Sequence, residues 1–452
     1  MKKQKIHFIA IGGSAMHNLA IALHKKGHTI TGSDDEIFDP SRSRLAQYNL
    51  LPTSIGWQPE QITSDLDAVI LGMHAKQDNP ELKKAKKIGL PVYSYPEYLF
   101  EQTKNKKRIA IAGSHGKTTT TAMIMHVLKK ANINFDYMVG ASINGFDTMV
   151  NLEEENELAV FEADEYLSSP IDMRSKFLWY KPHLSAITGI AWDHINVFPT
   201  FESYVDTFNQ FLNTIPKDGK VFYFEEDLRL KSLINQHKKL ETVAYSGIES
   251  LSTENNTTIT IGGQKVPVPL FGDHNLQNLH VAYLILKELG IDDETFRMAI
   301  KTFQGASRRL QTLVDGSNPI FFDFAHAPSK VAATIAAIKN KFPHNTLLAC
   351  LELHTFSSLN QNFIPYYRNT MNPADEAIIY FNPHTLEHKK MPSLQKDFLH
   401  RSFNHHNLTV CTASEEVIQA AENAHKKGQI VLIMTSGNFN GVDFKQWSST
   451  LQ

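Results

Sequence analysis

A glycine-rich segment with one lysine and a run of threonines carries the strongest chemical signal in the chain. It reads Gly113-Ser-His-Gly-Lys-Thr-Thr-Thr120 and lies between an apolar strand-like run and a helix-like segment. Glycines let backbone N–H groups turn towards phosphate oxygens, and the unpaired N–H groups of the following helix face the same point. Lys117 adds a positive charge, and the Thr118 hydroxyl can reach a Mg²⁺ ion. We therefore predict a phosphate-binding loop.

The loop is shorter than the general form of this motif because residue 111 is Ile rather than Gly. The alternative interpretation is a glycine turn capped by threonines.

Three carboxylates, Glu162, Asp164 and Glu165, stand at the end of another predicted strand. Like charges this close are costly to hold together without a cation. Hard oxygen ligands suit Mg²⁺, so the group predicts metal binding, with an exposed acidic turn as the alternative. The pair Asp193-His194 also follows a predicted strand and could supply a metal ligand, a base or only a turn.

A weaker nucleotide signal lies near the N-terminus. Gly12-Gly13-Ser14 follows the first apolar run without completing Gly-x-Gly-x-x-Gly, and Asp34 stands where a ribose-binding acid would follow the second strand. This arrangement predicts phosphate or nucleotide recognition, and the alternative is close packing of a helix on a strand.

Composition narrows the functional classes. At roughly 150 residues per domain, 452 residues predict about three domains. Lys and Arg number 45 against 47 Asp and Glu, so there is no global cationic field for binding nucleic acid. No apolar run is long enough for a membrane helix, and the short one at the N-terminus predicts a strand rather than a signal peptide. Cys350 and Cys411 are expected to be small buried residues in a reducing compartment, which indicates a cytoplasmic protein.

The order of the elements predicts an α/β fold. Three times an apolar strand, a turn and an amphipathic helix begin anew, near residues 6, 108 and 319. We expect helices at 118–130, 277–289 and 329–341, the last with Ser329 as its N-cap, and a small β excursion over 243–270. The polar segment 101–107 is predicted to be a linker. The expected strands cover 6–11, 29–31, 68–71, 108–113, 158–162, 184–188, 221–224, 319–324, 347–353, 376–381, 408–411 and 430–434.

Nearly end to end, the chain resembles the Mur ligases, the ATP-dependent amide-forming enzymes of bacterial cell-wall synthesis. In order along the chain, the resemblance is carried by Gly12-Gly-Ser14, Gly113–Thr120, Glu162-Ala-Asp-Glu165, Asp193-His194, Gly272-Asp-His-Asn-Leu-Gln-Asn278, Arg308-Arg309 and Asp323-Phe-Ala-His326. It implies a Rossmann-like UDP-sugar domain at 1–104, a central P-loop ATP-binding domain at 105–312 and a Rossmann-like amine-binding domain at 313–452.

The resemblance also implies roles for individual residues. Lys117, Glu162 and His194 would be catalytic, with Thr118, Glu162 and His194 holding Mg²⁺. The ATP site would comprise Gly113, Ser114, His115, Gly116, Lys117, Thr118, Thr119, His274, Asn278, Arg309 and Asp323. The UDP-sugar and amine sites would include Gly13, Ser14, Asp34, His74 and His326. The third domain is expected to close over ATP and exclude water from an acyl phosphate.

Within the family, the resemblance is nearest to the murein peptide ligases, which join UDP-N-acetylmuramate to the tripeptide L-alanyl-γ-D-glutamyl-meso-diaminopimelate. It depends on Asp172–Phe177, Asp323–His326 and Met434–Gly441. Ser114, Ala327 and His354-Thr-Phe356 depart from the family pattern. Because the last two lie in the amine-binding domain, ligation of L-alanine in primary peptidoglycan synthesis is the alternative to tripeptide recycling. A P-loop phosphotransferase and a non-catalytic UDP-sugar sensor are more distant alternatives.

Overall fold

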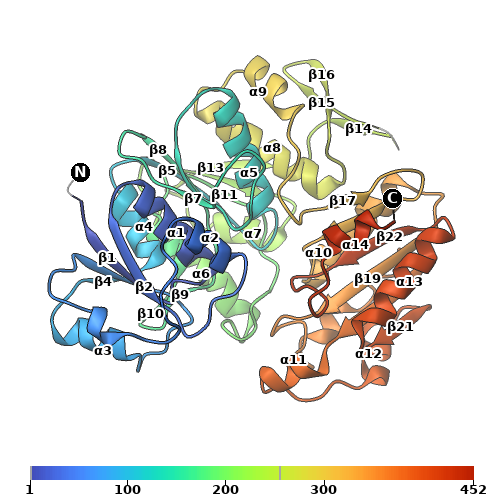
Figure 1. The fold of residues 1–452 in the computed structure, drawn as a ribbon. Helices are drawn as coiled ribbons and strands as arrows, with labels where there is room; N and C mark the ends of the chain where they lie inside the picture. The colour runs from blue at the N-terminus through green and yellow to red at the C-terminus, as the bar shows by residue number, and fades with distance from the viewer. Residues whose placement is uncertain (1–2, 254–255, 452) are drawn as a thin grey trace. The chain divides into compact units, whose positions relative to one another are not determined.

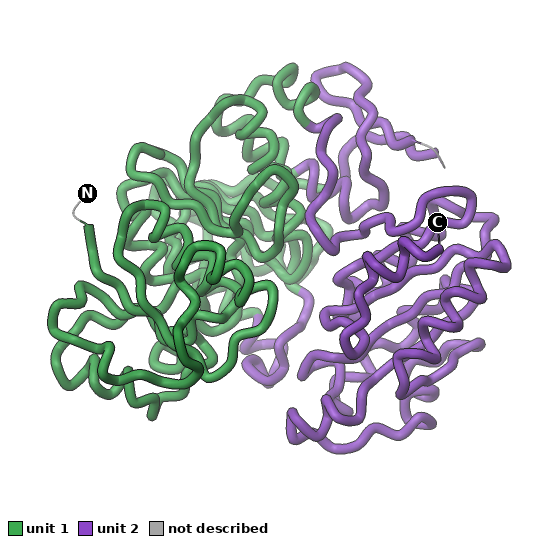
Figure 2. The backbone as a smooth tube through the Cα atoms, viewed as in Figure 1, with its two compact units in different colours: residues 1–190, 205–246, 281–299 green, residues 191–204, 247–280, 300–452 purple. Residues whose placement is uncertain are grey.

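A computed structural model describes residues 3–253 and 256–451. These residues form two compact units, coloured separately in Figure 2. The first comprises 1–190, 205–246 and 281–299, and the second comprises 191–204, 247–280 and 300–452. Across the two units the chain builds three α/β sheets, which confirms the predicted fold class of three tandem α/β domains (Figure 1). The domain boundaries near 104 and 312 stay a prediction.

The first unit begins with a four-stranded parallel sheet in the order β2-β1-β3-β4. Its two central strands are short and mostly apolar, as expected where helices cover a parallel sheet. The four strands are β1 (Lys5–Ile9), β2 (Thr29–Ser33), β3 (Ala68–Leu71) and β4 (Val92–Ser94). The accompanying helices are α1 (Ser14–Lys25), α2 (Ser41–Gln47), the 3₁₀ turn Pro59–Gln61, α3 (Pro80–Lys87) and α4 (Tyr95–Thr103).

The second sheet of this unit has seven strands in the order β13-β12-β11-β5-β8-β6-β7, and only β7 runs antiparallel to its neighbour. The strands are β5 (Lys107–Ala112), β6 (Asp136–Met138), β7 (Val150–Asn151), β8 (Leu158–Glu162), β11 (Leu184–Ile187), β12 (Lys220–Phe224) and β13 (Glu241–Tyr245). A hairpin of β9 (Leu167–Ser169) and β10 (Asp172–Ser175) leads into the 3₁₀ turn Lys176–Trp179. The helices of this part of the chain are α5 (Lys117–Lys130), α6 (Phe201–Asn213), α7 (Leu228–Ile234), α8 (Asp273–Glu288) and α9 (Asp293–Ile300).

The second unit contains a small antiparallel sheet and a six-stranded sheet. The small sheet consists of β14 (Ser250–Ser252), β15 (Thr257–Ile261) and β16 (Gln264–Val268). The larger sheet, which is the third α/β sheet of the chain, has the order β17-β18-β22-β19-β20-β21 and is parallel except for β17. Its strands are β17 (Gln311–Val314), β18 (Ile320–Asp323), β19 (Leu347–Leu353), β20 (Glu376–Phe381), β21 (Leu408–Cys411) and β22 (Ile430–Met434). Its helices are α10 (Pro328–Lys341), the 3₁₀ turn Ile364–Tyr367, α11 (Pro383–His388), α12 (Lys396–Phe403), α13 (Ser414–Lys426) and α14 (Phe444–Ser449).

Alternation along β19 divides the core of the six-stranded sheet between its two faces. Leu347, Ala349 and Leu351 belong to one buried cluster, whereas Leu348 and Cys350 belong to another. Successive side chains of a strand point to opposite faces, so one strand supplies both cores. Cys350 and Cys411 are free and buried, as the sequence predicts.

Three sequence expectations about local structure are wrong. The supposed linker 101–107 is shorter than expected: residues 101–103 end α4, which a capping box of Ser94 and Glu97 starts, and residue 107 begins β5, so only 104–106 connect the two. Helix α10 begins at Pro328 with Ala327 as its N-cap, so Ser329 lies inside it; proline is favoured at the first helical position. The β excursion is shorter than expected, since residues 243–245 belong to β13 of the seven-stranded sheet.

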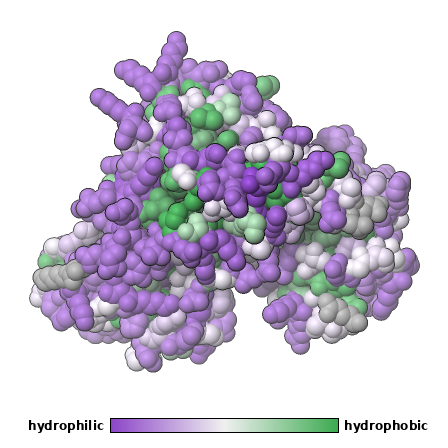
Figure 3. Space-filling view, turned by 90° about the horizontal axis from the view of Figure 1, so that it is seen from above, coloured by the Kyte–Doolittle hydropathy of each residue, from purple (hydrophilic) through white to green (hydrophobic). Residues whose placement is uncertain are grey.

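Hydrophilic residues cover most of the surface that Figure 3 displays. Within the described part of the chain, no helix combines the length and apolar character that crossing a membrane requires.

Candidate active site

The glycine-rich loop connects the end of β5 to the first turn of α5. Gly113 has φ +117° and Gly116 has φ +73°, backbone conformations that favour glycine. A Cβ atom on Gly113 would lie 2.4 Å from Thr188 Oγ1 and 2.7 Å from the Thr188 nitrogen. Glycine is therefore required at position 113 both by the backbone conformation and by the close approach of the strand beside β5.

The end of β11 holds the loop in place. The Ser114 amide donates to the Gly189 carbonyl at 3.0 Å, and the Thr188 hydroxyl donates to the carbonyls of Ala112 and His115. Sequence reasoning missed Thr188. Parallel strands present their carboxyl ends at one edge of the sheet, where ligands bind. The position of Thr188 at the end of a predicted strand was therefore the only sequence signal that it lies beside the loop.

Lys117 is the first residue of α5, and its ammonium is largely buried. Its Nζ donates to the Gly113 carbonyl at 2.6 Å and to Glu165 Oε2 at 2.8 Å. Burial lowers the pKa of Lys117, but the carboxylates of Glu165, Asp164 and Glu162 outweigh that effect and keep this pKa above its ordinary value. Lys117 is therefore a cation held at the mouth of the loop.

Lysines neutralise two of the three clustered carboxylates. Lys176 Nζ lies 2.5 Å from Asp164 Oδ2, and Glu165 pairs with Lys117. In this structure lysines therefore balance the charges of Asp164 and Glu165, and metal binding by the acidic group stays a prediction. Lys176 lies in segment 172–177, twelve residues after Asp164, and nothing in the sequence indicated that the two side chains would form an ion pair.

Glu162 is different, since it forms no ion pair with any residue that the structure describes. Its Oε1 accepts from the Thr118 hydroxyl at 2.8 Å, and its Oε2 accepts from the Gly140 amide at 2.7 Å. A Cβ on Gly140 would lie 2.8 Å from Glu162 Oε1, so this glycine, which sequence analysis also missed, makes room for the carboxylate. Thr118 and Glu162 thus place two hard oxygen donors side by side next to the loop, a donor set that fits Mg²⁺.

The predicted UDP-sugar residues follow the carboxyl ends of β1, β2 and β3, which are neighbours in the first sheet. Gly12 N donates to Asp34 Oδ2 at 2.7 Å, and burial raises the pKa of Asp34 to about 6. Gly13 is the N-cap of α1, and Ser14 and His74 are exposed at the same edge. This edge contains a topological switch point, where open α/β sheets bind ligands.

In the second unit, the structure brings His326 close to Asp193. His326 Nε2 lies 3.8 Å from Asp193 Oδ2, and both side chains are buried. Burial lowers the pKa of His326 to about 3, so this imidazole is neutral at pH 7. His194 follows with φ +56°, and its amide donates a hydrogen bond to the neighbouring Asp193 Oδ1 at 2.7 Å. That His194 and Glu162 share a metal stays a prediction.

The residues predicted to contact adenine and ribose lie on α8 and around β18. His274 and Asn278 are four residues apart and share one face of α8. The Asp323 carboxylate accepts from Leu310 N at 3.0 Å and from the Thr334 hydroxyl at 2.6 Å. Arg309 Cζ lies 4.5 Å from the centre of the Phe324 ring. Asp323 thus already stabilises the start of the third sheet, and its contact with ATP stays a prediction.

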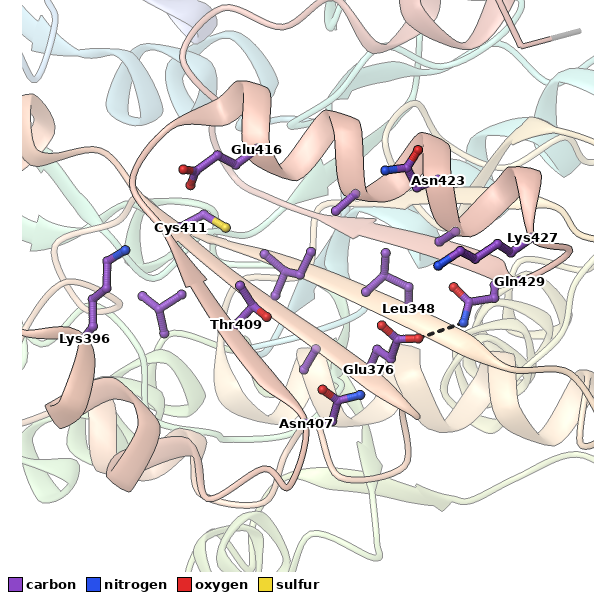
Figure 4. Close-up of a pocket in the computed structure, with 15 residues that line it drawn as sticks. Leu348, Glu376, Lys396, Asn407, Thr409, Cys411, Glu416, Asn423, Lys427 and Gln429 are labelled. Carbon is purple, nitrogen blue, oxygen red and sulfur yellow. Dashed lines mark hydrogen bonds between the residues drawn. The ribbon is translucent and has the colours of Figure 1, made fainter.

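A separate cavity of about 510 Å³ lies beside α13 and strands β20 and β21 (Figure 4). Its polar lining mixes lysines, glutamates and amides, and the Glu376 carboxylate accepts from Gln429 at 2.8 Å. None of the residues predicted for the active site lines this cavity, whereas the buried Cys411 does.

Fold and loop together define an enzyme that binds a nucleoside triphosphate at a P-loop. Comparison with known proteins agrees: residues 5–107 match the model of the Mur ligase family catalytic domain, and residues 111–286 match that of the Mur ligase middle domain. The chain is 30% identical to the UDP-N-acetylmuramate–L-alanine ligase of Caldicellulosiruptor saccharolyticus, over 96% of either chain. It therefore belongs to the Mur ligase family and is an ATP-dependent ligase that forms a C–N bond.

Solved structures with the same fold come from two branches of this family. The UDP-N-acetylmuramate-alanine ligase of Thermotoga maritima has a TM-score of 0.72 at 21% identity. The murein peptide ligase of Psychrobacter arcticus has a TM-score of 0.68 at 24% identity. In both comparisons the alignment covers 99% of this chain and 98% of the other. At these identities the likeness establishes the fold.

Proposed function

We propose that the enzyme uses ATP to join the lactyl carboxylate of UDP-N-acetylmuramate to the α-amino group of an L-alanyl substrate, with free L-alanine as the first candidate. The observation that carries the ATP chemistry is the P-loop with Lys117, Thr118 and Glu162 gathered at its mouth. Support for L-alanine comes from the relatives at 27–31% identity, which are named UDP-N-acetylmuramate–L-alanine ligases.

A second candidate amine is the tripeptide L-alanyl-γ-D-glutamyl-meso-diaminopimelate, which also presents an L-alanyl amine. Sequence segments 172–177, 323–326 and 434–441 favour it, since they carry the resemblance to the murein peptide ligases. The reaction at the carboxylate is the same for both amines, so the two candidates differ only in what the third sheet recognises.

The chemistry needs ATP because a free carboxylate has no adequate leaving group. Attack of the lactyl carboxylate on the γ-phosphate gives an acyl phosphate and ADP, and attack of the amine on the acyl carbon then releases phosphate. In the first step two anions approach each other, which costs about 4 kcal/mol per pair of unit charges at 4 Å and an effective dielectric constant of 20. Lys117, whose pKa keeps it charged, offsets this repulsion.

The oxygen donors beside the loop would hold Mg²⁺. Thr118 and Glu162 are the residues proposed for it, and when bound the ion would neutralise charge on the phosphate oxygens. The Thr118 hydroxyl donates to Glu162 in this structure, so the two proposed ligands already lie side by side. At the first sheet, Gly13, Ser14, Asp34 and His74 are proposed to bind the uridine nucleotide.

Product analysis tests this proposal. L-alanine, the tripeptide and the corresponding tetrapeptide are supplied separately with ATP, Mg²⁺ and UDP-N-acetylmuramate, and products are identified by mass while phosphate release is followed. We expect an amide product and phosphate release that depends on the amine. Phosphate release without any amine, or phosphorylation of a hydroxyl, would instead identify a phosphotransferase or simple ATPase.

The variant Lys117→Ala tests the role of the phosphate-binding loop. It should lose ligation by at least about 10³-fold, because a charge that stabilises the transition state is gone, while binding of UDP-N-acetylmuramate measured by calorimetry stays close to normal. Near-normal ligation by this variant would refute the assignment of the loop.

A further inference from the structure

Lys389 is a partly buried cation at the carboxyl edge of the third sheet. It directly follows α11, which begins two residues after the end of β20. Its Nζ lies 4.3 Å from the centre of the Phe356 ring, and Phe356 is 42% exposed. Among the residues that the structure describes, no carboxylate pairs with Lys389, and burial alone accounts for the lowering of its pKa.

The acidic groups around Lys389 are engaged elsewhere. Glu352 is buried at the end of β19, where its Oε2 accepts from the Phe439 amide at 3.0 Å and from the Thr435 hydroxyl, and its Oε1 lies 3.7 Å from His354 Nδ1. Glu387 Oε2 lies 3.5 Å from His384 Nδ1. Neither carboxylate forms an ion pair with Lys389. Burial lowers the pKa of His354, and the positive charge of Lys389 lowers it further.

A partly buried ammonium without a counterion is unfavourable unless something recovers the lost hydration. Contact with the Phe356 ring and the position at the C-terminus of α11 recover part of it. An anionic group of a ligand would supply what the protein lacks. Phe356, which contacts that ammonium, is partly exposed and offers apolar surface for the carbon chain that carries such an anion.

The location favours an anion distant from the reacting nitrogen. The sheet order β18-β22-β19 puts two strand spacings, roughly 10 Å, between β18 and β19. His326, which the family resemblance predicts near the incoming amine, follows β18, whereas the Lys389 ammonium lies over Phe356, which follows β19. In L-alanine one carbon atom separates the amine from the carboxylate, which is too short for this span. An extended tripeptide reaches about 10 Å through its backbone, and a γ-linkage and a long side chain add to that.

We propose that Lys389 binds a carboxylate of a peptide amine at a distance from the reacting α-amino group, and so determines the length of amine that the enzyme accepts. This inference depends on the proposed function, because it assigns the substrate of that same reaction. It makes Lys389 a specificity-determining residue, with Phe356 packing beneath the same substrate segment.

Steady-state kinetics with Lys389→Met tests the inference, with Lys390→Met as the matched control because Lys390 is the exposed neighbouring lysine. KM and kcat are measured for the tripeptide, for a tripeptide amidated at its diaminopimelate carboxylates, and for L-alanine. We expect Lys389→Met to raise the KM for the tripeptide about 10- to 100-fold with little change in kcat, as for loss of a charge-assisted hydrogen bond. The amidated tripeptide should be equally poor for wild type and variant, and Lys389→Arg should restore most of the affinity.

The outcomes separate the two proposals. A wild-type enzyme that ligates only L-alanine, or a Lys389→Met variant with unchanged KM for every amine, overturns the role of Lys389 and leaves the ligase function standing. An equal rise in KM for ATP or for UDP-N-acetylmuramate would reveal a structural role of Lys389 and also overturns the inference. If the wild type ligates no amine, the proposed function itself fails.

Discussion

Lys117 and Glu165 form a buried ion pair, with 2.8 Å between Nζ and Oε2 and side-chain exposures of 13% and 1%. The same ammonium donates to the Gly113 carbonyl, so it bridges the phosphate-binding loop and the acidic segment after β8. Glu165 thus positions the Lys117 ammonium that we propose binds the phosphates of ATP.

Glu165→Gln should destabilise the protein, because it leaves the Lys117 ammonium buried without its partner. We expect the free energy of unfolding to fall by about 3 kcal/mol, measured by urea denaturation. ATP should restore part of this loss, so its stabilising effect should be larger in the variant than in the wild type. Glu157→Gln, a change at an exposed residue just before β8, is the control. Equal stability of the two variants would contradict a structural role for the pair.

Glu162→Gln should raise the Mg²⁺ concentration needed for half-maximal ligation by about tenfold or more. The amide keeps an oxygen that can accept from Thr118 or Gly140, but it lacks the negative charge that a hard divalent cation prefers. The measurement is a Mg²⁺ titration of initial rate at saturating ATP. The Glu157→Gln variant should titrate like the wild type, and an unshifted curve for Glu162→Gln would argue that the metal is held elsewhere.

The sequence predicted the strands well because their apolar runs are local. The limits of β3, β8, β19, β20, β21 and β22 agree with the expected ranges, and helix α5 begins one residue before the expected start. The loop at 113–120 was also recognisable, since its residue types and their order are contiguous. These features need no knowledge of long-range contacts.

Contacts between distant segments could not be read from the sequence. Nothing in the sequence around Lys176 indicated that it would neutralise Asp164, and Gly140 and Thr188 are ordinary residues until the sheet order puts them beside Glu162 and Gly113. The acidic cluster therefore looked like three unbalanced carboxylates, whereas the structure leaves only Glu162 of the three without a lysine partner.

The raised pKa of Asp34 predicts a pH dependence of stability. With a pKa of about 6 when folded and about 3.9 when unfolded, the folded protein holds a proton between pH 4 and 6 that the unfolded chain has released. The free energy of unfolding should therefore fall as the pH rises through this window, by about 3 kcal/mol at most. Asp34→Asn should flatten this part of the profile in urea denaturation series from pH 4 to 7. If the unfolding free energy of the wild type and of Asp34→Asn changed with pH in the same way, the raised pKa of Asp34 would be contradicted.

Gly113→Ala tests whether the loop requires glycine for its backbone conformation alone or also for the approach of Thr188. Gly290 provides the comparison, because it has a similarly positive φ of +85° but no atom within 4 Å of an added Cβ. Gly290→Ala should cost only the backbone strain, about 1–2 kcal/mol of unfolding free energy. Gly113→Ala adds a contact of 2.4 Å with Thr188 Oγ1 and should cost about 3–5 kcal/mol in total. Because the alanine also displaces the carbonyl that receives Lys117, ATP-dependent ligation should fall in Gly113→Ala and stay normal in Gly290→Ala. Equal costs and equal activities in the two variants would mean that the strand beside β5 does not constrain the loop.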